Sequence, residues 1–150
     1  MRVVLTVDVW LMALLAASSC AARLLNRWLA GEAYTPIMCR EMLDEAERLL
    51  AEPRMAQRHG LDAAGIRGLR QRWESQIVVI EAAGQAEPLA LRCALAGQAG
   101  FIVTHDPTLL ALGQYRGVQI LTPMGWMAFR HWRESACEPD TLAQKEHRDR

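Results

Sequence analysis

The chain has 150 residues, of which 51% are hydrophobic and 23% charged. This composition is typical of one globular domain and excludes a disordered or fibrous chain. Its 17 basic residues are balanced by 17 acidic ones, so any nucleic-acid site has to be a local patch within a neutral surface. The four cysteines are far apart and form no CxxC pair, which argues against structural zinc and favours reduced thiols in the cytoplasm.

The first 22 residues superficially resemble a signal peptide, with an early Arg, an apolar run and small residues before Cys20. Asp8 interrupts the apolar run, and the uncharged stretch from Val9 to Ala22 is too short to span a bilayer. We therefore predict a buried strand followed by a helix, no membrane segment and a cytoplasmic protein. The alternative is export, which would leave a mature chain beginning near Cys20.

The first half of the chain is predicted to form two strands separated by helices. The expected elements are strands at Val3–Val7 and Gln76–Ile80, and helices at Trp10–Ala17, Cys20–Ala30, Ile37–Glu52 and Leu61–Trp73. We expect Thr35 and Pro36 to start the helix at Ile37, because Thr caps helices and Pro suits their first turn. Asp62 is the expected cap of the helix after Gly60.

The second half repeats the alternation of helices with short apolar strands. The expected elements are a helix at Pro88–Gln98, a strand at Phe101–Thr104, a short helix through Leu112, a strand at Val118–Leu121 and a final helix after Thr122 and Pro123. Such alternation is typical of an α/β fold with a parallel sheet and helices on both faces. We predict one domain over residues 1–132 and a polar C-terminal extension over 133–150.

Four acids are candidates for one site. Asp8 follows the first strand and Asp106 follows the strand that ends at Thr104, and the carboxyl ends of parallel strands meet at one edge of the sheet. Glu41 and Glu87 lie near the starts of predicted helices. Clustered carboxylates suit Mg²⁺ or Mn²⁺, which can activate water against a phosphodiester. The structural alternative is that Asp106 only caps a helix and that Glu41 and Glu87 are ordinary first-turn acids.

Several segments resemble a PIN domain of the bacterial type often paired with an antitoxin. They are VVLTVDVWLMALL, ARLLNRWLAGE, TPIMCREMLDEAERLLAEPRM, EPLALRCALAGQAGFIVTHDPTLLAL and GVQILTP, and together they run over about residues 2 to 130. The resemblance implies a three-layer α/β/α sandwich and a metal-dependent ribonuclease with acids at one sheet edge. It implies that Asp106 is one of these acids and Thr104 its usual neighbour. It also implies Mg²⁺ or Mn²⁺, an RNA substrate, an antitoxin protein and homodimerisation, for which the apolar stretch Met124–Trp132 offers a surface.

The acidic motif departs from the family pattern at three places. The family's leading Asp-x-Asn element falls on Thr6 and Asp8, so either the leading acid is missing or Asp8 replaces it from a shifted position. The family's helical Glu is either Glu41 or Glu45, one turn apart. The acid that the family carries at the start of the helix before the Thr-x-Asp strand falls on a proline.

That proline is Pro88, with Glu87 beside it, and proline cannot bind a metal. We therefore predict Asp8, Glu41, Glu87 and Asp106 as the catalytic acids, with Asp8, Asp106 and Glu41 as the metal ligands. Thr6, Thr104 and Glu45 are the predicted supporting residues. A PIN-like domain that has lost catalysis and binds RNA or a protein is the alternative function.

Basic residues are concentrated before the strand at Gln76. They are Arg54, Arg58, His59, Arg67, Arg70 and Arg72. Of these, we predict Arg54, Arg58, Arg70 and Arg72 to contact RNA phosphates. The alternative is an ordinary solvated helical face. The tryptophans are scattered and are better explained as core or interface residues than as a surface for stacking bases.

Overall fold

The computed structural model describes residues 1–82, 84–85 and 87–136. The strands among them are β1 (Arg2–Leu5), β2 (Thr35–Cys39), β3 (Val78–Ile80), β4 (Phe101–Val103), β5 (Gln114–Tyr115) and β6 (Val118–Leu121). They form one sheet in the order β3-β2-β1-β4-β6-β5. All neighbouring strands are parallel except β5 and β6. The predicted α/β fold with a mostly parallel central sheet is confirmed.

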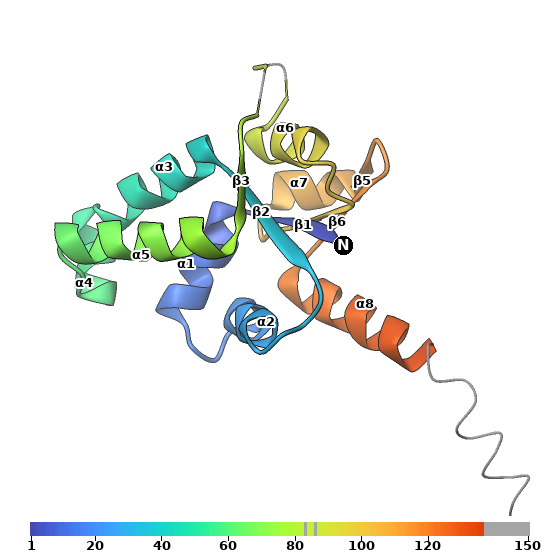
Figure 1. The fold of residues 1–150 in the computed structure, drawn as a ribbon, viewed down its shortest axis with the longest axis horizontal. Helices are drawn as coiled ribbons and strands as arrows, with labels where there is room; N and C mark the ends of the chain where they lie inside the picture. The colour runs from blue at the N-terminus through green and yellow to red at the C-terminus, as the bar shows by residue number, and fades with distance from the viewer. Residues whose placement is uncertain (83, 86, 137–150) are drawn as a thin grey trace, which may run out of the picture.

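Helices cover both faces of this sheet (Figure 1). They are α1 (Val7–Leu15), α2 (Cys20–Leu29), α3 (Arg40–Leu50), α4 (Pro53–His59), α5 (Ala63–Gln76), α6 (Leu89–Ala96), α7 (Pro107–Leu112) and α8 (Pro123–Ala136). In Figure 1, α6 and α7 lie on one side of the sheet and α2 and α8 on the other. The short helix α4 and the edge strand β5 are elements that the apolar pattern did not predict.

The first strand is shorter than predicted. It ends at Leu5, and Thr6 is the N-cap of α1, with its carbonyl accepting hydrogen bonds from the backbone N–H groups of Val9 and Trp10. Val7 is therefore helical, although the β-branched run Val3–Val7 predicted that it would end the strand. Asp8 consequently lies in the first turn of α1, and its position relative to Thr6 is set by helical geometry.

The prediction of a helix starting at Thr35 and Pro36 is wrong, because these residues form the strand β2. The Thr35 N–H bonds to the Met1 carbonyl on the β1 side, at 2.7 Å. Successive backbone N–H groups of a strand point to opposite sides, so the position of Pro36, which has no N–H, faces β3. Pairing with β3 starts only at Ile37. The absence of an N–H at Pro36 therefore removes no hydrogen bond between β2 and β3. The helix α3 begins later, at Arg40.

Both predicted aspartate caps are confirmed. The Asp62 side chain accepts from the Gly65 N–H at the start of α5, and the Asp106 side chain accepts from the Thr108 N–H at the start of α7. The final helix continues to Ala136, past the predicted domain boundary at residue 132. Residues 137–150 of the predicted extension lie outside the described residues.

The N-terminal strand lies at the centre of the sheet. Val3, Val4 and Leu5 have no exposed surface, and a chain beginning near Cys20 would lack this strand. No single helix in the described part of the chain has the length and hydropathy needed to cross a bilayer. Only α1 and α2 together would meet that test, and they are bent by 94° relative to each other.

Candidate functional site

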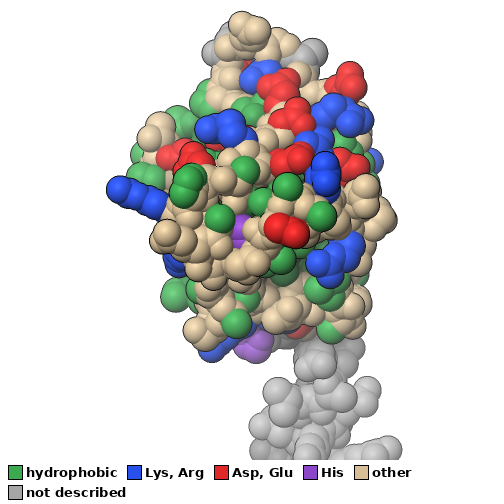
Figure 2. All heavy atoms as spheres, turned by 90° about the vertical axis from the view of Figure 1, so that its left-hand side faces the viewer, with side chains coloured by type: hydrophobic (Ala, Val, Ile, Leu, Met, Phe, Trp, Pro, Cys, Tyr) green, Lys and Arg blue, Asp and Glu red, His purple; other side chains and the backbone are tan. Residues whose placement is uncertain are grey.

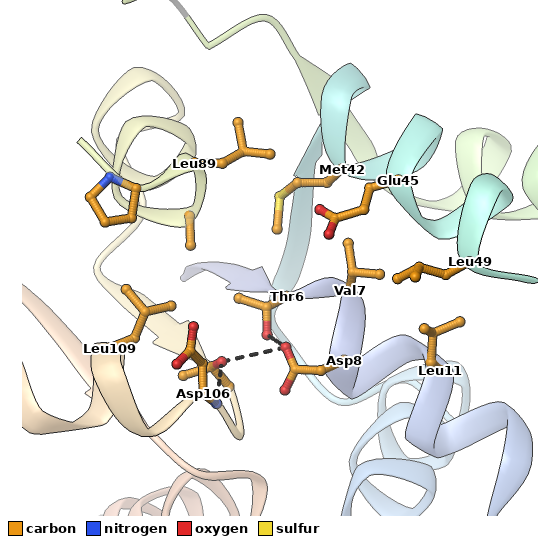
Figure 3. A pocket seen from close by; sticks show the side chains of 13 residues that line it. Thr6, Val7, Asp8, Leu11, Met42, Glu45, Leu49, Leu89, Asp106 and Leu109 are labelled. Carbon is orange, nitrogen blue, oxygen red and sulfur yellow. Dashed lines mark hydrogen bonds between the residues drawn. The ribbon is translucent and has the colours of Figure 1, made fainter. Parts of the chain in front are cut away.

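A pocket of about 290 Å³ opens at the carboxyl ends of β1 and β4 (Figure 3). Its walls come from the start of α1, one face of α3, the start of α6 and the turn between β4 and α7. The lining residues are Thr6, Val7, Asp8, Leu11, Met42, Glu45, Leu49, Pro88, Leu89, Ala90, Thr104, Asp106 and Leu109. This edge of the sheet is where an α/β fold places its ligands.

Asp8 is held by donors from two strand ends. Its Oδ1 accepts a hydrogen bond from the Thr6 hydroxyl, and the Thr104 hydroxyl lies 3.5 Å from the same oxygen. Its Oδ2 accepts from the backbone N–H of His105 at 2.7 Å. Because the side chain is still 42% exposed, these bonds orient the carboxylate without removing it from solvent.

A buried hydroxyl links Asp8 to Asp106. Thr104 has no exposed surface, and its Oγ1 accepts from the Asp106 backbone N–H at 3.0 Å. The hydroxyl proton of Thr104 is then free to point toward Asp8. Asp106 itself caps α7 through Oδ1, at 2.9 Å from the Thr108 nitrogen. The Asp106 carboxylate therefore both caps α7 and lines the pocket, so its interpretation as a helix cap is compatible with its interpretation as a site residue.

The third acid in the pocket is Glu45. Glu41 and Glu45 lie one turn apart on α3, but of these two only Glu45 lines the pocket, on the wall facing Asp8 (Figure 3). Glu41 lies outside it and approaches the guanidinium of Arg92, at 3.6 Å. The sequence left Glu41 and Glu45 as alternatives for the family's helical acid, and of these two the structure places Glu45 in the pocket.

Glu87 is also outside this pocket. Its Oε1 accepts a hydrogen bond from the Tyr115 hydroxyl at 2.5 Å and lies 3.6 Å from the Arg116 guanidinium. The hydrogen bond to Glu87 raises the pKa of the partly exposed Tyr115 phenol. Pro88, in contrast, lines the pocket. The position at which the family carries an acid therefore lies at the pocket, but in this chain it is a proline without a carboxylate.

The acids in the largely apolar lining of the pocket have no compensating base beside them in that lining. None of its described lining residues is Lys or Arg. Nor do any three Asp, Glu, His or Cys side chains in the described ranges stand close enough to hold one ion. Mg²⁺, however, usually keeps several waters and takes only one or two protein carboxylates. Exposed carboxylates at Asp8 and Asp106 fit such a water-rich divalent ion, and they do not fit an all-protein cage.

The predicted RNA-binding bases do not form a uniform surface. Arg54, Arg58 and Arg72 are exposed. Arg70 instead contacts Asp44 and Glu47 at 2.6 Å and Glu74 at 2.8 Å. Hydrogen bonds to Glu74 and then Glu47 raise the pKa of Arg70 above its already high ordinary value.

Two further observations weaken the basic patch. The ring nitrogens of His59 bond to the backbone of Leu50 and Leu61, which gives that side chain a structural role. On the side of the molecule that carries α3, α4 and α5, basic and acidic side chains are interspersed (Figure 2). Any contacts to RNA phosphates on this side would therefore come from individual exposed arginines and not from a continuous basic surface.

The PIN domain family model matches residues 2–108. This chain belongs to the PIN domain family. PIN domains are typically nucleases and commonly bind divalent metals. No curated protein matches the chain.

The PIN match ends inside α7, whereas β6 and α8 continue the same sheet and core. Within the matched region, the structure brings Thr6, Asp8, Thr104, Asp106 and Glu45 to one pocket and leaves Glu41 and Glu87 outside it. His105 also belongs to the site, although no role was predicted for it from the sequence. The feature of the sequence that could have indicated His105 is its position between Thr104 and Asp106.

Proposed function

We propose that this PIN domain is a ribonuclease that depends on Mg²⁺ or Mn²⁺ and cleaves RNA internally at the pocket beyond β1 and β4. The observation that carries the proposal is the meeting of Asp8 and Asp106, which come from distant parts of the chain and share Thr104 as a hydrogen-bonded link. A pocket with exposed carboxylates and no lining base attracts cations, and hard oxygen donors select Mg²⁺ or Mn²⁺.

In this proposal Asp8 and Asp106 hold the ion and Glu45 faces it across the pocket. The ion, when bound, lowers the pKa of a water and stabilises charge on the phosphodiester. Thr6 and Thr104 keep the Asp8 carboxylate in place, so that Asp8 replaces the acid that the family carries at the position of Thr6. The exposed Arg54, Arg58 and Arg72 are the proposed contacts to RNA phosphates.

The proposed partners rest on the family resemblance. We propose an antitoxin protein as the partner of this chain, which would make it the toxin of such a pair. We also propose a homodimer, supported by Met124 and Trp132 of α8, whose surfaces are 67% and 66% exposed. Large exposed apolar side chains of this kind are typical of contact surfaces.

A second function, a PIN domain that binds RNA or a protein without cleaving, is favoured by a different observation. Both oxygens of Asp8 already accept hydrogen bonds from the protein, and the position of Pro88 contributes no acid. A carboxylate satisfied in this way is stable without a metal. The two functions differ in whether a divalent ion stabilises the fold.

Thermal unfolding with and without Mn²⁺ distinguishes these functions. An ion that binds only the folded protein at 100 times its Kd adds about 2.7 kcal/mol, which raises the melting temperature of a chain of this size by about 5–10 °C. We expect this rise in the wild type and its loss in Asp106→Asn. Asn is itself a good N-cap, so α7 should persist in the variant.

The matched control is Asp62→Asn, which makes the same change at the N-cap of α5, away from the pocket. This variant should keep the full response to Mn²⁺. A metal-dependent rise confined to proteins with Asp106 would justify an RNA cleavage assay on the same set. Absence of any rise in the wild type would instead support the binding function.

A further inference from the structure

His105 occupies the edge of the pocket between two site residues. It follows Thr104 and precedes Asp106, and its side chain is 38% exposed. The ring Nδ1 lies 3.3 Å from Asp8 Oδ2, the oxygen that also accepts from the His105 backbone N–H at 2.7 Å. One residue thus approaches one carboxylate oxygen with both its main chain and its side chain.

The two oxygens of Asp8 are held from different directions. Oδ1 is bonded by the Thr6 hydroxyl, on the β1 side, and Oδ2 by His105, beyond the end of β4. The terminal torsion of an aspartate is broad, so a single donor would leave the carboxylate plane free to rotate. Donors on both oxygens restrict that rotation, and the His105 ring lies beside the donor to Oδ2, with Nδ1 at 3.3 Å from that oxygen.

The orientation of a carboxylate matters when it binds a metal. Groups that hydrogen-bond to metal ligands set their orientation, and removing such a group typically weakens metal binding by about 10- to 100-fold. Resting on the function proposed above, we propose that His105 is a positioning residue, which fixes the plane of the Asp8 carboxylate through Nδ1 so that Asp8 presents its free face to the divalent ion. His105 itself neither binds the ion nor contacts the reacting phosphate.

Isothermal titration of the whole protein with MnCl₂ tests this role in three variants. His105→Leu removes the ring donor but keeps the backbone N–H, and we expect its Kd for Mn²⁺ to rise about tenfold. His105→Asn places an amide N–H near the position of Nδ1, so its Kd should stay within about twofold of the wild type. His59→Leu breaks backbone contacts of a histidine outside the pocket. It should lower the melting temperature and leave the Kd unchanged.

A metal-free measurement separates this inference from the proposed function. Urea unfolding of His105→Leu, Asp8→Asn and the double variant should show shifts of the midpoint that do not add, because the two side chains interact. If the wild type binds Mn²⁺ and His105→Leu binds it equally well, the positioning role is wrong and the ribonuclease proposal stands. If the side chains are coupled but the wild type binds no Mn²⁺, the ribonuclease proposal fails, and His105 then orders Asp8 for stability alone, which also overturns its role at a metal.

Discussion

Single residues in this protein show how environment decides the role of a side chain. Thr6 and Thr104 are the buried polar residues of the described core, and both direct their hydroxyls at Asp8. Arg70 has the charge to bind RNA, but three carboxylates already neutralise it. Tyr34 carries a hydroxyl into the core, where it donates to the Leu24 carbonyl at 3.0 Å. In each case the partner, and not the residue type, sets the function.

Tyr34 makes stability depend on alkaline pH. Burial, and next the nearby Glu32 carboxylate, raise the pKa of the Tyr34 phenol above its ordinary value of about 10. The unfolded chain therefore loses the phenol proton first, so the stabilising contribution is complete below pH of about 10 and is lost as the pH rises further. We expect the free energy of unfolding of the wild type to fall between pH 8 and pH 11 by more than that of Tyr34→Phe.

Urea unfolding at the two pH values measures this difference. Tyr34→Phe should also be less stable by about 1 kcal/mol at pH 8, because it lacks the hydrogen bond to Leu24. Other groups that titrate in this range do so in both proteins and cancel in the comparison. Equal losses in the two proteins would show that Tyr34 does not carry the effect.

At the scale of elements, the start of α3 decides which glutamate faces the pocket. Thr35–Cys39 forms a strand buried between β1 and β3, and α3 begins only at Arg40. Glu41 is then in the first turn, beside Arg92, and Glu45 reaches the pocket one turn later. A shift of the helix start by a few residues would have rotated a different face of α3 toward Asp8.

Glu41 and Glu45 of α3 form a matched pair for a metal-binding experiment. If Glu45 faces the bound ion, Glu45→Gln removes a negative charge from the site and should weaken Mn²⁺ binding severalfold. Glu41→Gln removes the same charge one turn away and should leave the Kd within about twofold. Isothermal titration with MnCl₂ on both variants checks this. The opposite order of affinities would place the metal site at Glu41, outside this pocket.

At the scale of the whole molecule, the C-terminal helix is part of the domain that the PIN match covers only to residue 108. Trp126 of α8 is 1% exposed, and its ring lies 5.0 Å from that of Phe101 and 5.5 Å from that of Tyr34, between ring centroids. These contacts join α8 to β4 and to the segment before β2. The helix therefore closes the core on the face of the sheet opposite α6.

Truncating Trp126 should destabilise the whole domain. We expect Trp126→Ala to lower the free energy of unfolding by about 3–5 kcal/mol, because it leaves a large cavity in the core. Trp126→Phe should cost much less, since it keeps an aromatic ring and removes an indole N–H that has no hydrogen-bond partner among the described residues. Urea unfolding followed by circular dichroism measures both. A small effect of Trp126→Ala would mean that α8 detaches from a core that is stable by itself.

The order of local signals along the chain was enough to predict the fold class. Apolar runs at residues 3–5, 101–103 and 118–121 alternate with helices along the chain, and Asp62 and Asp106 cap helices where their neighbours predicted it. These features depend on residues close in sequence, so periodicity and capping chemistry suffice. The THDP segment after β4 likewise indicated the family that the comparison with known proteins then showed.

Tertiary structure alone decided the strand at Thr35–Cys39 and the composition of the pocket. Thr-Pro favours a helix start locally, but pairing with two neighbouring strands and full burial outweigh that preference. Likewise, the choice of Glu45 over Glu41 depends on the packing of α3 against α1, and the alignment of Asp8 depends on Thr104 and His105 from the turn after β4. The sequence by itself determined most of the strands and helices, and it placed Asp8 and Asp106 near strand ends. Which side chains meet depends on contacts between segments far apart in the chain, and no local pattern encodes them.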